Sequence, residues 1–128
     1  MRRLTRHQVL LLHAQLLAET GGADGVRDEA LLDAALESPY AGFEDTEFYP
    51  SIEAKAARLA FGLVNDHPFM DGNKRIGVMA MLVLLDIIGV QLHVTDADLI
   101  WLGLSLAKGE LDASEVLAWI EQHVERTA

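Results

Sequence analysis

The sequence predicts an all-α fold, and three observations support that prediction. Apolar residues recur at helical spacing through most of the chain. Glycines and prolines stand at the boundaries of these periodic stretches, where turns are expected. One stretch, 78–85, is apolar on every side, which is typical of a helix at the centre of a domain. We expect about six helices in all.

The first helix is expected to follow Thr5, a good N-cap residue, and to run to about Glu19 with its apolar residues on one face. Basic residues followed by apolar ones can also mark a signal peptide. Here His13 and Gln15 interrupt the apolar run, and no small-residue cleavage site follows it. An amphipathic helix is therefore the preferred interpretation.

Two further helices are expected before the centre of the chain. Residues 28–36 form a short helix that ends before Pro39, because the residue preceding a proline disfavours helical geometry. Ser51 caps a third helix from Ile52 to about Asn65. Between them, Tyr40 to Tyr49 shows no clear periodicity, so this stretch is either a loop or a short hairpin.

Three helices are expected in the second half. The fourth, from about Asn73 to Ile88, is too short to span a bilayer comfortably and includes Asp86. Residues 90–94 alternate in polarity and predict a brief strand. A fifth helix, capped at residue 95 or 96, runs through Leu106, and a last one covers about 114–125. Both tryptophans are expected in the core: Trp101 and Trp119.

Length and charge limit the classes of function. The 128 residues suit a single domain, 1–128, with a substantial core. The formal net charge of −10 disfavours direct binding of nucleic acid, which is itself a polyanion. The absence of cysteine excludes disulfides and thiolate chemistry and is compatible with the cytoplasm, where we expect the protein to work without a membrane span.

The stretch HPFMDGNKR, residues 67–75, concentrates chemically useful side chains between two apolar helices. If a helix begins near Asn73, its free backbone N–H groups and dipole favour a bound phosphate. Gly72 allows the backbone to approach a ligand, and Lys74 and Arg75 add positive charge. Residues 72–75 therefore predict a cradle for an anion.

Two other residues of this stretch extend the prediction. Asp71 would oppose a bound phosphate unless a cation such as Mg²⁺ joins them. His67 can take a proton near neutral pH, as a general base does. Each residue also has an ordinary explanation as a cap, a turn or a solvated charge. Phe69 is expected to fix the loop by packing into the core.

The same nine residues resemble the signature HPFx(D/E)GNxR of the Fic/Doc family and fill each of its fixed positions. Upstream landmarks of the short Doc branch also have similar counterparts in this chain. They are residues 25–28, Leu31-Leu32, Ala35-Leu36 and Tyr49-Pro50. The resemblance covers most of the chain. It implies a compact bundle of α-helices with this loop between two central helices.

The resemblance also implies roles and partners. His67 would be the general base, Asp71 the ligand of Mg²⁺, and Gly72, Asn73 and Arg75 the phosphate-binding residues. The donor would be ATP or another nucleoside triphosphate, and the acceptor a hydroxyl on a protein. The irregular stretch 40–49 would be the flap that aligns the target segment as an added strand.

Lys74 bears on which group is transferred. Family members that transfer AMP usually have glycine there, whereas the Doc branch has lysine and resembles a kinase that transfers the terminal phosphate. The loop combines Gly72-Asn73, as in AMP transferases, with Lys74-Arg75, as in the Doc branch. We expect a Doc-like toxin kinase that inhibits translation, with elongation factor Tu as the target that the resemblance suggests. The alternatives are an AMP transferase and a non-catalytic interaction module.

Control of such a toxin is expected to come from a second chain. Many Fic proteins carry an inhibitory motif, (S/T)xxxE(G/N), whose glutamate pairs with the arginine of the signature. This sequence contains no match to that motif. The resemblance therefore implies a separate antitoxin, which often folds a segment onto its toxin.

Overall fold

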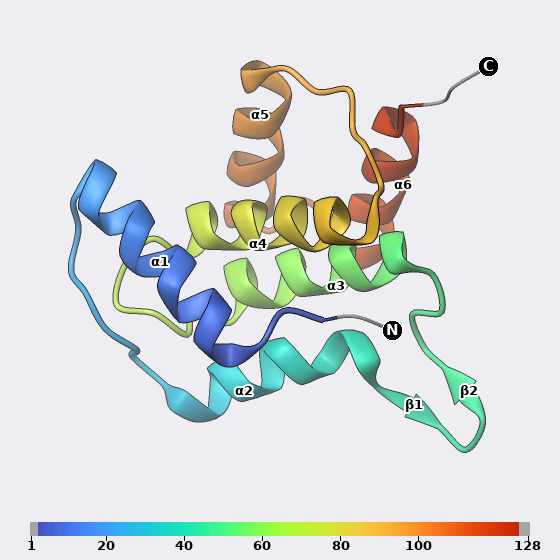
Figure 1. The fold of residues 1–128 in the computed structure, drawn as a ribbon, viewed down its shortest axis with the longest axis horizontal. Helices are drawn as coiled ribbons and strands as arrows, with labels where there is room; N and C mark the ends of the chain where they lie inside the picture. The colour runs from blue at the N-terminus through green and yellow to red at the C-terminus, as the bar shows by residue number, and fades with distance from the viewer. Residues whose placement is uncertain (1–2, 126–128) are drawn as a thin grey trace.

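The computed structural model describes residues 3–125 and has six α-helices within that range. In chain order they are α1 (Arg6–Thr20), α2 (Glu29–Glu37), α3 (Ile52–Asn65), α4 (Asn73–Ile88), α5 (Asp96–Ala107) and α6 (Ala113–His123). A 3₁₀ turn (Ser38–Tyr40) and an antiparallel hairpin, β1 (Gly42–Phe43) with β2 (Thr46–Glu47), lie between α2 and α3. The prediction of an all-α fold is confirmed (Figure 1).

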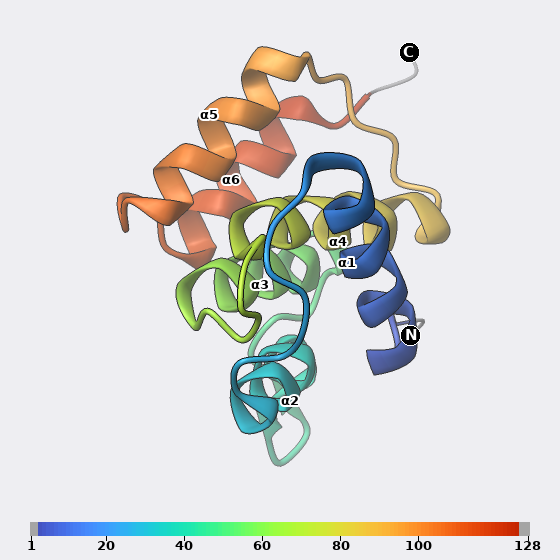
Figure 2. The same cartoon turned by 90° about the vertical axis from the view of Figure 1, so that its left-hand side faces the viewer.

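Helices α3 and α4 lie side by side at the centre of the bundle (Figures 1 and 2). Helices α1 and α5 pack against α4, whereas α2 and α6 pack against α3. A Cβ atom at Gly77 would lie 2.5 Å from Val64 Cγ2 and 3.1 Å from Ala60 O. The two central helices can approach this closely because Gly77 has no side chain.

Every helix contributes to the core. The fully buried apolar side chains include one from each helix in turn: Val9, Leu32, Leu63, Ile76, Leu102 and Ile120. Three polar or charged side chains are also buried in the described part of the chain: His13, Lys55 and Ser105. A buried polar group is costly unless it is hydrogen-bonded, so the contacts of His13 and Lys55 are informative.

The predicted helix starts agree with the caps that form. Thr5 accepts a hydrogen bond from the Gln8 N–H and Ser51 accepts one from the Ala54 N–H. The last helix begins at residue 113, one position earlier than expected, because Asp112 forms a capping box with Glu115.

Two stretches for which the sequence does not predict a helix, 40–49 and 90–94, contain short extended segments. Residues 40–49 contain the hairpin rather than an open loop. The strand expected over 90–94 forms only an isolated antiparallel bridge, between Leu92 and Val124. The His93 N–H donates to His123 O and the Glu125 N–H donates to Gln91 O on either side of it.

The tryptophan prediction is half wrong. Trp119 is buried, but 52% of Trp101 is exposed. Helix α5 is apolar on two faces: Leu102 and Leu106 enter the core, while Ile100 and Trp101 point outward. Periodicity alone could not show which face turns inward. In the described part of the chain, no helix is both long enough and apolar enough to cross a membrane.

Candidate active site

The segment HPFMDG joins α3 to α4. Residues 25–28 lie beside it and are joined to it by backbone hydrogen bonds. The N–H groups of Arg27 and Asp28 donate to Pro68 O at 2.8 and 3.1 Å. The Met70 N–H donates to Gly25 O at 3.0 Å. Residues 25–28, which are part of the family resemblance, therefore hold the backbone of this loop in place through three hydrogen bonds.

Phe69 locks the loop from inside. Its ring is buried in the core, as the sequence predicts. The Asn73 side chain holds the same residue: its Oδ1 accepts from the Phe69 N–H at 2.9 Å and its Nδ2 donates to Phe69 O at 3.1 Å. The Asn73 amide is thus engaged with the loop itself, so a phosphate would meet the backbone N–H groups of the first turn of α4.

His67 is exposed and has a backbone φ of 51°, a left-handed conformation that is uncommon for residues other than glycine. Arg27 supports it, because its Nε donates to His67 O at 2.7 Å and its Nη2 donates to Asp66 O at 3.1 Å. His67 Nδ1 lies 3.1 Å from Asn65 O. A carbonyl can only accept, so Nδ1 is the donor in this contact, and Nε2 is the ring nitrogen that could accept a proton when the ring is neutral.

Asp71 is placed so that its carboxylate stays ionised. Its Oδ1 accepts from the Gly72 N–H at 2.8 Å and its Oδ2 accepts from the Ala23 N–H at 3.3 Å. These two hydrogen bonds, with the charge of Arg75 nearby, hold the pKa of the Asp71 carboxyl below its usual range. The side chain is half exposed, so one face of the carboxylate remains open to a ligand.

Mg²⁺ suits this carboxylate. The described residues contain no cluster of three or more acidic, histidine or cysteine side chains that could hold a metal by themselves. Mg²⁺ commonly binds through one or two carboxylates together with water and substrate phosphates. A single ionised Asp71 beside a phosphate cradle fits an ion that arrives with a nucleotide.

Gly72 is the N-cap residue of α4 and has a φ of 77°. The nearest atoms to a Cβ at this position would be 3.5 Å away, which is ordinary contact distance. Glycine is therefore needed here for its left-handed backbone and not for space around it.

Lys74 and Arg75 point in different directions. The Arg75 guanidinium reaches back to the Thr20 hydroxyl at the end of α1 and lies 3.9 Å from Asp71 Oδ1. The Lys74 stem lies instead along α5, where a Cβ at Gly103 would come within 3.1 Å of its Cγ. The two cationic side chains therefore lie on different sides of the α4 N-terminus, Arg75 toward α1 and Lys74 toward α5.

The residues selected from the sequence gather around one hollow. It has a volume of about 360 Å³ and is lined by the predicted site residues and Met70: His67, Asp71, Gly72, Asn73, Lys74 and Arg75. A second, mostly apolar groove of about 440 Å³ adjoins it, between α1, α4 and α5. Lys74 and Arg75 line both.

Comparison with known proteins identifies the family. A family model described as the Fic/DOC family matches residues 3–85. The chain belongs to the Fic/Doc family. Proteins of this family are generally transferases that use a nucleoside triphosphate.

A Doc toxin is among the relatives of this Fic/Doc protein. The chain is 44% identical over 72 residues to a protein named toxin Doc from Mycolicibacterium smegmatis. The match covers 56% of this chain and 55% of that protein, so the chain spans about half the length of the relative it matches. This similarity agrees with the resemblance of the loop to the Doc branch.

Several residues of this Fic/Doc site were not selected from the sequence. Nothing in the local sequence marks the roles of Arg27, which donates to His67 O, and Thr20, whose hydroxyl meets the Arg75 guanidinium. In the sequence His13 is only an interruption of the first apolar run, yet its Nε2 lies 2.8 Å from Asp71 O in the loop. A histidine on the apolar face of the first helix was the one local signal, because buried histidines need a partner.

Proposed function

We propose that this Fic/Doc protein is a Doc-like kinase that transfers the terminal phosphate of ATP, or of another nucleoside triphosphate, to a hydroxyl of a protein target. One observation carries the proposal. A single hollow collects a histidine whose Nδ1 is hydrogen-bonded to a backbone carbonyl, an ionised aspartate, a helix N-terminus and two cations. These are the parts that phosphoryl transfer requires, because its catalysis is mainly positioning and charge stabilisation.

In the proposed reaction, His67 Nε2 takes the proton of the target hydroxyl. The hydroxyl oxygen forms a bond to the γ-phosphorus, and the bond from that phosphorus to the bridging oxygen breaks. The nucleoside diphosphate leaves with the electron pair of that bond. Asp71 would hold Mg²⁺, which neutralises phosphate charge when it is bound.

The phosphates would be held at the beginning of α4. The backbone N–H groups of residues 73–75 belong to the first turn of the helix, so they have no partner within it. The Arg75 guanidinium offers several donors in a planar fork that matches phosphate geometry. Gly72 gives the chain the left-handed turn that aims this helix end at the hollow.

Transfer of AMP is the second candidate, because Gly72-Asn73 follows the pattern of AMP-transferring members. ATP labelled at the γ- or α-phosphate separates the two reactions. Label from the γ-position on a protein target supports the kinase, and label from the α-position supports AMP transfer. No transfer of either label to any protein in a lysate would favour a non-catalytic interaction module.

Replacing Lys74 with glycine is expected to shift the reaction toward AMP transfer. The Lys74 stem occupies space beside α5, and its ammonium adds charge at one end of the phosphate site. Removing both opens a path for the nucleotide to extend. The measurement is the ratio of α- to γ-label on the same target. A Lys74→Met variant, which retains a stem without charge, separates the two effects; pure kinase activity in Lys74→Gly would contradict the role given to Lys74.

The exposed hairpin is the proposed docking site of the protein target. Phe43 and Phe48 are both exposed on it, and the edge of a two-stranded sheet can accept a further strand. A threonine of elongation factor Tu is the target suggested by the Doc resemblance, and its modification would inhibit translation in the cytoplasm.

A separate antitoxin is the proposed regulator, and the apolar groove is its proposed contact surface. The groove shares Lys74 and Arg75 with the hollow, so a segment bound there would lie across the entrance to the phosphate site. Ile100, Trp101 and Leu104 are exposed apolar residues on α5, and two of them line the groove. We commit to an apolar segment of the antitoxin as its occupant; a short upstream reading frame encoding it would support the proposal.

Leu104→Glu is expected to block neutralisation while leaving toxicity intact. The added charge would be buried against the apolar antitoxin segment, which should weaken binding by about 10-fold or more. Growth of cells that express the toxin variant with its antitoxin measures the effect. Leu11→Glu is the matched control, because Leu11 is similarly exposed (53%, against 42% for Leu104) but does not line the groove. Equal neutralisation of both variants would remove the groove as the contact surface.

A further inference from the structure

His13 is a buried histidine that lies outside the signature loop. Its side chain is 2% exposed and belongs to the inward face of α1. Its ring stacks on the Phe69 ring, with centroids 3.8 Å apart and planes 13° from parallel. Its Nε2 lies 2.8 Å from Asp71 O. Because a carbonyl oxygen only accepts, Nε2 carries a proton and donates it to this hydrogen bond.

One peptide group connects His13 to the proposed metal ligand. The carbonyl of Asp71 and the N–H of Gly72 belong to the same planar peptide. The carbonyl accepts from His13, and the N–H donates to Asp71 Oδ1 at 2.8 Å. In a planar trans peptide, fixing the direction of the carbonyl fixes the direction of the N–H. His13 therefore determines where the donor that holds the Asp71 carboxylate points.

We infer that His13 is a positioning residue of the active site: it orients the Asp71–Gly72 peptide so that the carboxylate faces the bound nucleotide and its metal ion. The inference rests on the proposed function, because it takes Asp71 as the metal ligand. Replacing a residue that orients a metal ligand through hydrogen bonds commonly costs about 10- to 100-fold in metal affinity or activity.

Simple packing does not account for this residue. An apolar side chain could fill the space between α1 and Phe69 without the cost of burying an imidazole. The buried ring is instead satisfied by the one carbonyl that precedes the α4 N-cap. Leu17, one turn further along α1, approaches the same place and would lie 3.5 Å from a Cβ at Gly72. Helix α1 thus supports the metal side of the loop at two successive turns.

Two substitutions separate the hydrogen bond from the packing. His13→Phe keeps a ring for stacking on Phe69 but removes the donor. His13→Gln keeps a donor near the position of Nε2 but removes the ring. Both are made in the His67→Ala background, so that the nucleotide is not consumed during titration. Val9→Ala is the control, because Val9 is fully buried one turn earlier on α1 and its side chain has no hydrogen-bonding group.

Calorimetric titration with ATP and Mg²⁺ is the first measurement. We expect His13→Phe to bind Mg²⁺-ATP about 10- to 100-fold more weakly than its parent, and His13→Gln to recover part of the loss. ATP without Mg²⁺ should bind to His13→Phe and to its parent with equal affinity, since the backbone N–H groups of residues 73–75 are unchanged. Val9→Ala should lower thermal stability without lowering the affinity for Mg²⁺-ATP. A His13→Phe protein that is folded and binds Mg²⁺-ATP as the parent does would overturn the inference.

The amide proton of Gly72 provides a second measurement that needs no nucleotide. Its NMR resonance should shift and its hydrogen exchange should quicken in His13→Phe, because the peptide is no longer held. If the parent fails to bind Mg²⁺-ATP at all, the proposed function fails, and the Gly72 amide still decides the inference. An unchanged Gly72 amide in His13→Phe would show that His13 does not orient this peptide.

Discussion

Replacing His67 with alanine is expected to lower the rate of phosphate transfer by about 10²- to 10⁴-fold, the range typical for loss of a general base. In the proposed reaction His67 Nε2 would be the proton acceptor, because Nδ1 is engaged by Asn65 O. The other groups around the hollow are the Asp71 carboxylate, which is the proposed Mg²⁺ ligand, and several hydrogen-bond donors, and these do not replace an uncharged base. The measurement is transfer of γ-label to the target under single-turnover conditions.

The backbone of His67 calls for a matched control. A φ near 51° is uncommon for residues other than glycine, but Asn, Asp and His adopt it more often than other side chains do. His67→Asn tolerates this conformation better than alanine does but provides no base at neutral pH. Both variants should therefore lose transfer, while their affinities for Mg²⁺-ATP stay close to that of the parent. Normal transfer by either variant would remove His67 as the base, and weakened nucleotide binding in His67→Ala alone would indicate a backbone effect.

The elements of the fold were predictable because their signals are local. A Ser, Thr or Asp that caps a helix acts within three residues, and an apolar face repeats within one or two turns. Thus α3 and α4 have the bounds expected from the sequence. The direction in which a helix faces is not local, which is why Trp101 was expected in the core and lies on the surface.

The residues of the candidate site also differ in how local their sequence signals are. The residues with chemistry of their own lie within nine positions, so their type and spacing could be read directly. The residues that hold them come from far along the chain: Arg27 reaches His67 across 40 positions, and His13 reaches Asp71 across 58. No spacing rule connects such pairs. Even Asn73, which was selected as a phosphate ligand, has its side chain on the Phe69 backbone.

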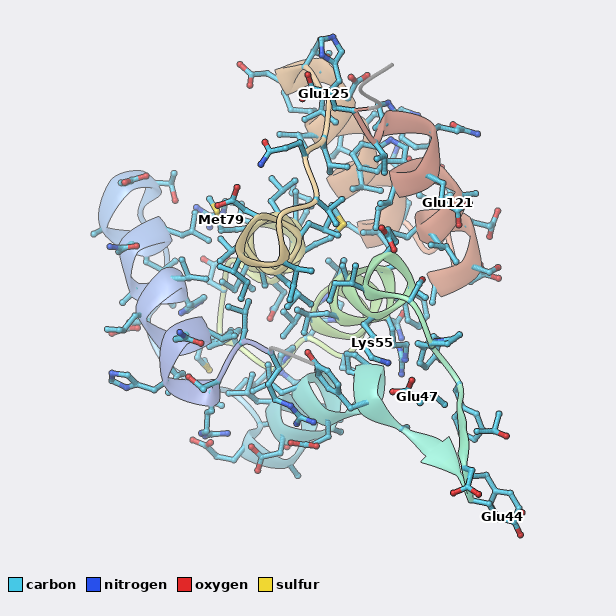
Figure 3. All side chains as sticks on the ribbon, turned by 45° about the vertical axis from the view of Figure 1, so that its right-hand side comes forward. Glu44, Glu47, Lys55, Met79, Glu121 and Glu125 are labelled. Atoms are coloured by element: carbon cyan, nitrogen blue, oxygen red, sulfur yellow. The ribbon has the colours of Figure 1, made fainter. Side chains whose placement is uncertain are left out.

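Lys55 offers a second large effect, at the root of the hairpin. It lies on the buried side of α3, and the whole residue is 0% exposed to solvent. Its Nζ donates to Glu47 Oε1 at 3.0 Å, and both residues are labelled in Figure 3. The same Nζ donates to the carbonyl of Tyr49 and lies 5.6 Å from the centre of the Tyr40 ring. A buried ammonium thus connects the central helix α3 to the last residue of β2 and to Tyr49 just beyond it.

Removing only the acid from this pair is expected to be costly. Glu47→Ala leaves the Lys55 ammonium buried with one carbonyl and an aromatic ring, and should lower the free energy of unfolding by about 1–3 kcal/mol. Lys55→Met removes the charge as well and fills a similar volume, so it should cost less, because apolar replacements of buried charges are often nearly neutral. The double variant should be no less stable than Lys55→Met alone. Urea denaturation of the three proteins measures these differences, and additive losses would show that the two side chains do not interact.

The same variants test whether the pair positions the hairpin. In Lys55→Met the core is intact but β2 has lost its tie to α3, so amide hydrogens of residues 42–48 should exchange faster than in the parent. If the hairpin aligns the protein target, the KM for that target should rise while the affinity for Mg²⁺-ATP stays unchanged. Glu53→Ala is the control, because Glu53 is an acid on α3 that does not bind Lys55. A Lys55→Met protein with an unaltered hairpin and an unaltered KM would confine the buried lysine to a structural role.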